Sequence, residues 1–283
     1  MGLGIGRLVA TASWIDLRSR LISALVLGAF VILVALAGGL PFRLLCCATG
    51  VIVFDEWSKM TRAKRAGPSF KFLRRALFFG LFAFLIGEPE AAVALIVGAG
   101  LFIALIDRGE HKADWALGGL AYAAFAGLAP GFLRGDDAEG LAILGLVICV
   151  VWPTDIFAYF TGRTFGGPKI MPLISPKKTV SGSIGGLLAG VAFGTTFHMA
   201  LTGGFQPWIL VFTAVLSVLG QAGDFFESWV KRRFGVKDSG RIIPGHGGLM
   251  DRIDALIVAL GFAWLVGIAL AGFDHPARAF FEP

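Results

Sequence analysis

Four polar side chains within an otherwise apolar stretch have the spacing of one helix face. They are Asp224, Glu227, Ser228 and Lys231. Residues three or four positions apart lie on the same side of an α-helix, so these groups are close together if the segment is helical. Carboxylate oxygens suit a hard divalent cation such as Mg²⁺, and a lysine ammonium suits a phosphate. The face therefore predicts a site for a metal ion and phosphate.

A second acidic pair opens the next apolar run, and the segment between the two runs is rich in cations. Asp251 and Asp254 are three residues apart and share a helix face, while Asp238 lies in the connection. The cations are Lys231, Arg232, Arg233, Lys237, Arg241 and Arg252. These side chains suit phosphates, and the glycine-rich segment 244–248 leaves backbone N–H groups uncovered. The stretch 221–254 therefore predicts a metal-and-phosphate site between two membrane helices.

The composition is that of an integral membrane protein. Of the 283 residues, 56% are hydrophobic and only 16% are charged, and the mean hydropathy is +0.79. The net charge of +6 lies in loops between apolar runs, which favours anionic headgroups and nucleotide phosphates over nucleic acid as partners. Cys46, Cys47 and Cys149 fall in apolar runs and form neither a disulfide framework nor a metal-binding spacing.

Nine apolar runs predict an all-α, polytopic fold with about nine transmembrane helices in one domain, 1–283. The runs are 21–40, 42–55, 76–87, 91–106, 115–132, 141–161, 182–201, 208–230 and 255–271. The third run is short. If it crosses the membrane, its helix begins upstream of the run, near Phe70. The third and fourth runs alternatively form a re-entrant hairpin that turns at 88–90. The signature-bearing catalytic part is 141–271. Within it, the spacing of Gly186 and Gly190 suits close helix packing.

The distribution of Lys and Arg predicts the orientation in the membrane. With the N-terminus in the cytoplasm, all of the 25 Lys and Arg residues except Arg43, Arg134 and Arg278 fall in cytoplasmic segments. The loops 162–181 and 231–252 then face the cytoplasm, where nucleoside triphosphates are found. We expect the protein in the cytoplasmic (inner) membrane, with its active site on the cytoplasmic side.

A second polar motif surrounds the end of the sixth run. Asp155 lies about two turns inside it, Tyr159 follows one turn later, and Pro153 should loosen the helix. Asp155 either acts as a ligand or orienting group of the site, or forms a structural pair with a neighbouring helix. The lysines of the next loop, Lys177 and Lys178, either bind phosphate or anchor the helix end at the membrane surface. We expect Asp155, Asp224, Asp251 and this lysine pair to line one polar cavity.

Both motifs resemble the signature of the phosphatidate cytidylyltransferases, also called CDP-diacylglycerol synthases. The downstream matches are Ser228, Lys231, Arg232, Lys237, Asp238, Pro244, His246, Gly247, Gly248, Asp251, Arg252 and Asp254. The upstream matches are Asp155, Ala158, Tyr159, Gly162, Ser175, Pro176, Lys177, Lys178, Thr179, Gly182, Gly185 and Gly186. The chain departs from the pattern at Pro153 and Thr154, where small residues are expected. The N-terminal half matches more loosely, at Arg18, Arg20, Ser23, Glu56 and Trp57; Glu56 can equally reach water from a span end.

The resemblance implies transfer of CMP from CTP to phosphatidate, which gives CDP-diacylglycerol and pyrophosphate. It implies Mg²⁺ as cofactor, with a second cation left open, and a homodimer in membrane lipid. The implied metal ligands are Asp224, Asp251, Asp254 and Ser228, and the implied catalytic residues are Lys231, Asp238, His246 and Arg252. The implied substrate-binding residues are Asp155, Tyr159, Ser175, Lys177, Lys178, Arg232, Lys237, Gly247 and Gly248.

Three other functions are compatible with part of the pattern. A CTP-using lipid kinase shares the membrane setting and a phosphate site but would leave CDP as its product. An enzyme acting on archaeal ether lipids is poorly separated by sequence. A secondary transporter would use Asp155 and Asp224 as ion sites near the midplane, but it leaves the cation-rich, glycine-rich loop without a role.

Overall fold

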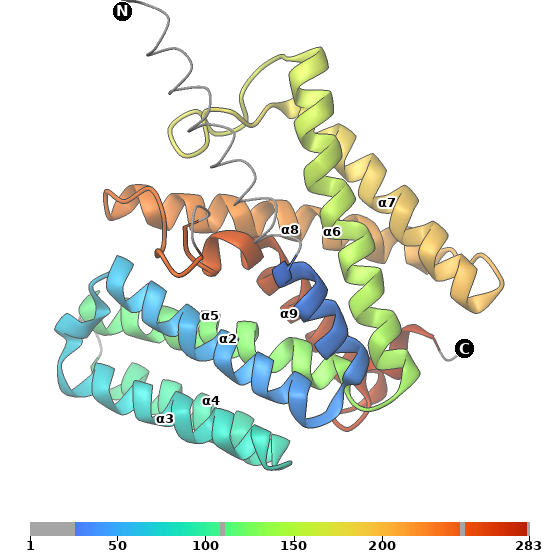
Figure 1. Cartoon of the computed structure of the whole chain (residues 1–283). Coiled ribbons are helices and arrows are strands. Elements are labelled where there is room, and N and C mark those ends of the chain that lie inside the picture. Colours follow the sequence, from blue (N-terminus) through green and yellow to red (C-terminus); the bar gives the residue numbers. More distant parts are fainter. Residues whose placement is uncertain (1–25, 108–110, 244–246, 282–283) are drawn as a thin grey trace, which may run out of the picture.

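The computed structural model describes residues 26–107, 111–243 and 247–281. Within these residues every regular element is a helix, and β-structure is limited to two isolated bridges (Figure 1). The helices are Val26–Ala37, α2 (Gly39–Met60), α3 (Pro68–Leu85), α4 (Pro89–Ile106), α5 (His111–Arg134), α6 (Ala138–Phe165), α7 (Val180–Thr202), α8 (Trp208–Arg233) and α9 (Met250–Ala271). Two short 3₁₀ helices are η1 (Ala63–Ala66) and η2 (Pro276–Phe280).

Six of the described helices, α4 to α9, are long and apolar enough to cross a membrane. This confirms the all-helical membrane fold but not the count of nine spans. The third helix starts at Pro68, which agrees with a start upstream near Phe70. Its first two turns carry Lys71, Arg74 and Arg75, which lower its apolarity. α3 and α4 form a helical hairpin whose turn precedes Pro89, a geometry that suits either two spans or a re-entrant pair.

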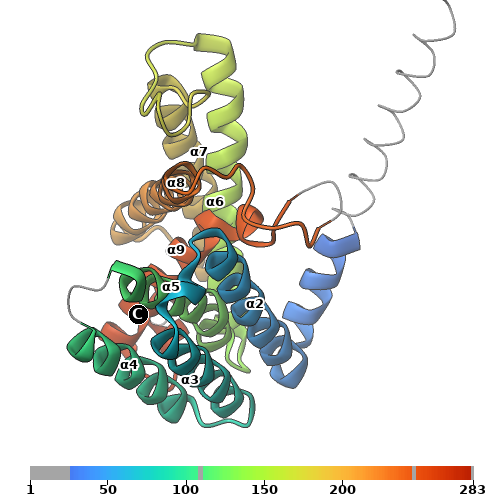
Figure 2. The ribbon, with the colours of Figure 1, turned by 90° about the vertical axis from the view of Figure 1, so that its left-hand side faces the viewer.

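Helices α2 to α5 lie side by side, and α9 packs against α5 (Figures 1 and 2). Aromatic side chains join this bundle to α8. The Trp57 ring lies 5.3 Å from that of Tyr122 and 6.0 Å from that of Phe226. The indole of Trp57 also donates a hydrogen bond of 2.8 Å to the carbonyl of Trp115. These contacts fix α8, which carries the acidic face predicted above, against α2 and α5.

Helices α6 and α7 form a tightly packed pair that projects from the bundle (Figures 1 and 2). The side of α7 that faces α6 consists of glycines at every fourth position: Gly182, Gly186, Gly190 and Gly194, all buried. A Cβ at Gly190 would overlap Thr154 Oγ1 and lie 3.0 Å from the carbonyl of Val150. The close packing expected from the glycine spacing is confirmed, and it brings the loop 166–179 to the end of α6.

α6 continues as a helix through Pro153 to Phe165, so the proline does not interrupt it. The neighbouring Thr154, the second position that departs from the family pattern, is buried. Its hydroxyl donates to the carbonyl of Val150 at 2.8 Å and lies 2.8 Å from Ser217 Oγ of α8. The Thr154 side chain is small enough to pack against the glycines of α7. Its hydrogen bond with Ser217 also connects α6 to α8.

Candidate functional site

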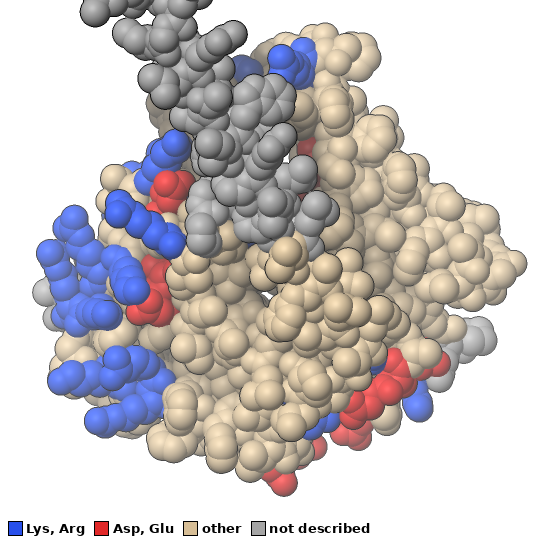
Figure 3. Space-filling view, in the orientation of Figure 1, with Lys and Arg blue, Asp and Glu red and all other residues tan. Residues whose placement is uncertain are grey.

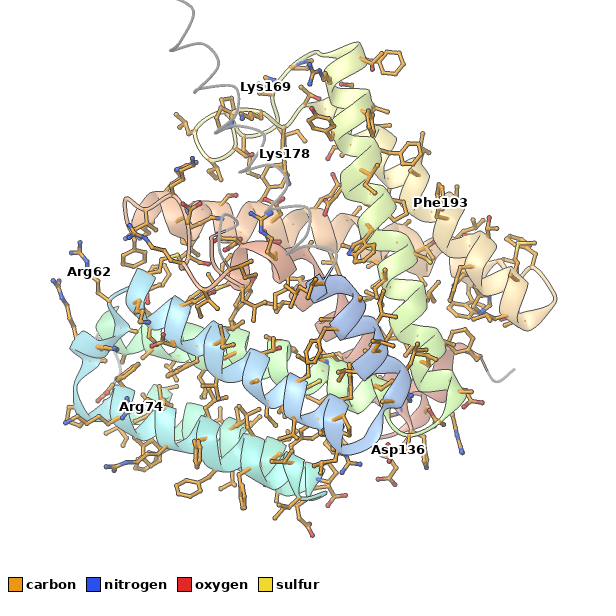
Figure 4. The ribbon with its side chains drawn as sticks, in the orientation of Figure 1. Arg62, Arg74, Asp136, Lys169, Lys178 and Phe193 are labelled. Carbon is orange, nitrogen blue, oxygen red and sulfur yellow. The ribbon has the colours of Figure 1, made fainter. Side chains whose placement is uncertain are left out.

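The two polar motifs meet where the loop 166–179 reaches α8. Lys178 Nζ lies 2.5 Å from Asp224 Oδ2, and Ser228 donates to the other oxygen of Asp224 at 3.3 Å. The loop is ordered by its own backbone: the N–H of Lys178 donates to the carbonyl of Ser175, and Thr179 caps α7. Lys178 also lies 4.7 Å from the centre of the Phe225 ring. The conformation of the loop therefore directs a lysine onto the acidic face of α8 (Figure 4).

A cavity of about 480 Å³ lies beside this ion pair. Its lining includes Asp155, Tyr159, Lys177, Lys178 and Asp224, from α6, the loop and α8. The sequence prediction that Asp155, Asp224 and the lysine pair share one cavity is confirmed. The inclusion of Asp251 was wrong, because that residue does not line the cavity. Tyr159 is oriented by Arg163, which donates to its hydroxyl at 2.8 Å.

Asp251 belongs to a second cluster, two turns further along α8. Lys231 Nζ lies 2.8 Å from Asp251 Oδ1 and 3.2 Å from Glu227 Oε2. The backbone N–H groups of Ser239 and Gly248 each donate to Asp251 Oδ2 at 2.9 Å. This carboxylate therefore ties the connection between α8 and α9 to the start of α9, in addition to pairing with Lys231.

Glu56 of α2 lies beneath this connection and is only 1% exposed. Its two oxygens accept hydrogen bonds from the N–H groups of Leu249 (2.9 Å) and Met250 (2.8 Å). These donors have no partner within the helix at a helix N-terminus, and a carboxylate there is also favoured by the helix dipole. Of the two interpretations left open by the sequence, the one in which Glu56 reaches water from the span end is wrong. No local signal predicts the contact, because 193 residues separate Glu56 from Leu249.

The glycines of the connection make room for this carboxylate and its neighbours. Gly247 has a φ of +88°, which favours glycine, and its missing side chain leaves space for Asp251 and Asp238. A Cβ on Gly248 would overlap Ser239 Oγ and lie 2.8 Å from Glu56 Oε1. The groups that approach these two glycines in this structure belong to the protein itself, and the substrate-binding role of the glycines stays a prediction.

Glu227 is the most deeply buried charge of the site. It is 0% exposed, and apart from the ion pair with Lys231 its oxygens have no hydrogen-bond donor among the described residues. The carboxyl group of Asp254 lies against it from α9. The hydroxyl of Tyr122, on α5, is buried near both carboxyl groups. It has no hydrogen-bond partner among the residues that the structure describes. A buried carboxylate pair needs a cation or a shared proton to offset its desolvation.

These residues fit a magnesium ion that is shared with substrate. No three Asp, Glu, His or Cys side chains within the described ranges converge closely enough to hold a metal alone. Mg²⁺ seldom needs such a cage, because it commonly takes one or two carboxylates, substrate phosphates and water. The pairs Glu227–Asp254 and Asp155–Asp224 supply that number of carboxylates. Three donors already occupy Asp251, so a cation there requires Lys231 to move away. In the same way, a cation at Asp224 requires Lys178 to move from its Oδ2 atom.

The remaining predicted residues lie at the rim of the site or outside the described ranges. Arg232 donates weakly to the carbonyl of Ile174, at 3.4 Å, and so connects α8 to the loop. Lys237, Asp238 and Arg252 are exposed in the connection and at the first turn of α9. His246 lies outside the described residues. Tyr122 joins the site although the sequence analysis did not name it. Glu227 was predicted only as part of the acidic face, and Glu56 only as a loose match to the family, so neither was given a role of its own.

Fold and site together define a polytopic membrane protein with carboxylates and lysines gathered at one end of its helices. Comparison with known proteins gives its family. The sequence matches the cytidylyltransferase family over residues 18–269, and the chain belongs to that family.

Relatives named phosphatidate cytidylyltransferase support the assignment. The protein of Brucella suis biovar 1 (strain 1330) is 39% identical over 94% of this chain and 99% of its own length. The protein of Bacillus subtilis (strain 168) is 29% identical over 89% of this chain and 98% of its own. A Staphylococcus saprophyticus protein is 43% identical over 48% of this chain and 53% of its own.

Proposed function

We propose that this protein transfers CMP from CTP to phosphatidate and releases pyrophosphate, which makes CDP-diacylglycerol for phospholipid synthesis. The observation that carries the proposal is the cavity in which Lys178 of the loop meets Asp224 of α8 beside Asp155. Such a cavity combines fixed cations with carboxylates, as the meeting of two polyanions requires. The family match and the named relatives support the same reaction.

An apolar groove next to the polar cavity supports a lipid substrate. This groove has a volume of about 520 Å³ and is lined by Ile174, Leu187, Phe225 and Trp229 among others. Ser183 and Gln221 line both spaces and are hydrogen-bonded to each other at the boundary. A phospholipid fits this arrangement with its phosphate among the lysines and its acyl chains along the groove.

The chemistry needs charge neutralisation more than proton transfer. A phosphate oxygen of phosphatidate, already anionic at neutral pH, attacks the α-phosphorus of CTP. The new P–O bond forms as the bond from that phosphorus to the bridging oxygen breaks, and pyrophosphate leaves with the electron pair. Lys177 and Lys178 of the cavity stabilise the phosphates, and Asp224 holds Lys178 in position. Lys231, in the neighbouring cluster, adds a third cation. Mg²⁺, held by carboxylates among Asp155, Asp224, Glu227 and Asp254, would supply Lewis-acid stabilisation of the transferring group.

The test uses the purified protein with phosphatidate, Mg²⁺ and CTP labelled at either the α- or the γ-phosphate. We expect α-label in the lipid extract and γ-label in pyrophosphate. Transfer of γ-label to lipid would identify a kinase instead. Failure of both labels to enter lipid with phosphatidate, but transfer of α-label to an ether-linked analogue, would change the substrate class.

The orientation belongs to the same proposal. We propose that the site faces the cytoplasm in the inner membrane, because the cation-rich loops then lie where CTP is available. The homodimer implied by the family resemblance stays a prediction.

A further inference from the structure

A second cavity, of about 530 Å³, lies between α2 and α3 and shares no residue with the candidate site. Three cations form part of its lining: Lys64 from η1 and Arg74 and Arg75 from α3. Figure 4 shows Arg74 far from Lys178 of the candidate site. The function proposed above gives this cavity no role.

The polar groups of the cavity lack partners. The side chain of Ser58 is 1% exposed, lines the cavity and has no hydrogen-bond partner for its hydroxyl among the described residues. Lys64 and Arg75 form no ion pair with any described residue. The Arg74 guanidinium lies 5.9 Å from the centre of the Phe70 ring. The one carboxylate in the lining, Asp55, is paired with Lys59. The cavity therefore carries a net positive charge and an unused hydroxyl.

The other wall of the cavity is apolar and open to the surroundings. Phe54 and Phe70 stack at 5.5 Å and form its floor. Phe78 and Phe79 follow one turn after the arginines on α3 and are 61% and 57% exposed. In a membrane this order places cations at headgroup level and aromatic rings beside the acyl chains.

We propose that this cavity binds an anionic glycerophospholipid of the cytoplasmic leaflet, at a site separate from that of the substrate. The phosphate lies among Lys64, Arg74 and Arg75 and accepts a hydrogen bond from Ser58, and an acyl chain follows Phe78 and Phe79. Charge selects against neutral lipids, since each cation near the membrane surface attracts anionic headgroups. The exposed aromatic wall selects against a free phosphate ion, which gains nothing from it.

Native mass spectrometry of the full-length protein tests this proposal. The protein is released from nanodiscs that contain equal amounts of phosphatidylglycerol and phosphatidylcholine, and the retained lipids are counted. Arg74→Gln/Arg75→Gln should reduce retained phosphatidylglycerol roughly tenfold or more, because each cation contributes about fivefold. The matched control, Arg65→Gln/Lys71→Gln, removes the same charge from the same region outside the cavity and should retain the lipid.

Several outcomes would overturn the proposal. An equal loss in the control variant would mean that the cations act only as a general anchor to the membrane surface. Equal retention of phosphatidylcholine would remove the charge selectivity, and displacement of the lipid by excess inorganic phosphate would identify a site for the free ion. If the double variant misfolds, as judged by size-exclusion chromatography, Lys64→Gln and Ser58→Ala replace it. Unchanged retention in both of these would also contradict the proposal.

Discussion

At the scale of single residues, the spacing along α8 predicted which side chains share a face but not what they contact. Asp224 pairs with Lys178 from the preceding loop, whereas Lys231, two turns on, pairs with Asp251 of α9. Both pairings join positions that are distant in the sequence and depend on how the helices pack. The acidic face was therefore predictable, while its division into two clusters was not.

Asp224→Asn should lower kcat/KM about a thousandfold or more while the protein still folds and inserts. The substitution keeps the shape of the side chain but removes the charge that holds Lys178 and that, in the proposed function, also holds a divalent ion. The lost stabilisation is several kcal/mol, and each tenfold in rate corresponds to about 1.4 kcal/mol. Initial rates at several Mg²⁺ concentrations measure the effect. Asp136→Asn, which removes an exposed carboxylate at 3.4 Å from Arg43, is the control. Near-normal rates with unchanged metal dependence would exclude Asp224 as a ligand.

Asp251→Asn tests a different role, since this carboxylate has three donors in the structure. We expect turnover to fall by orders of magnitude here also. Unlike Asp224→Asn, this variant should also lose stability, because a buried donor left without its acceptor costs about 1–3 kcal/mol. Thermal unfolding of the purified variant, followed beside its activity, distinguishes the roles. An unchanged unfolding temperature with lost activity would favour direct participation of Asp251 in metal binding.

At the scale of elements, local pattern predicted the helices and the close packing of α6 with α7. It did not predict that α2 organises the start of α9, because Glu56 gives no periodic signal and its partners are backbone N–H groups. Nor did the sequence predict that Thr154 fits between α6, α7 and α8. Contacts between elements that are distant in the chain depend on tertiary geometry, which single-sequence patterns do not contain.

Glu56→Gln should destabilise the first turn of α9, although Glu56 is not one of the residues proposed to contact the substrates. One of its two oxygens becomes an NH₂ group that cannot accept from Leu249 or Met250, which leaves a buried donor unsatisfied at a cost of about 1–3 kcal/mol. Hydrogen exchange at 247–250 should become faster, and activity should fall because Asp251 is displaced. Asp55→Asn, at the neighbouring exposed ion pair, is the control and should leave this exchange unchanged. Unchanged exchange in Glu56→Gln would exclude the capping role.

Gly190→Val should separate α6 from α7. The new side chain would overlap Thr154 Oγ1 and press on the carbonyl of Val150, and overpacking of this kind costs about 1–3 kcal/mol or more. We expect a lower unfolding temperature and reduced activity, because the loop that carries Lys178 joins these two helices. Gly98→Val on α4, where nothing lies within 4 Å, is the matched control. Equal stability of the two variants would contradict the role of the glycines.

At the scale of the whole molecule, the charge pattern read from the sequence corresponds to a spatial division. Figure 3 shows most of the visible Lys and Arg side chains gathered over the end of the bundle where α2 meets α3, with some acidic side chains among them, and a larger acidic patch near the opposite end. Arg62 and Asp136, labelled in Figure 4, lie at these two ends. This asymmetry was predictable from loop composition, since Lys and Arg lie mostly in alternate segments between the apolar runs. The projection of the α6–α7 pair from the bundle was not, since it depends on the packing of glycines against α6.

Cysteine labelling tests the membrane orientation that this asymmetry predicts. After replacement of Cys46, Cys47 and Cys149, single cysteines are placed at the exposed residues Lys169 and Asp136. A membrane-impermeant thiol reagent should label Asp136→Cys in intact cells but Lys169→Cys only after the inner face is opened, because Lys and Arg are retained on the cytoplasmic side. Lys64→Cys should behave like Lys169→Cys, which ties the second cavity to the same leaflet as the candidate site. Labelling of Lys169→Cys from outside intact cells would invert the topology, and the site would then lie away from cytoplasmic CTP.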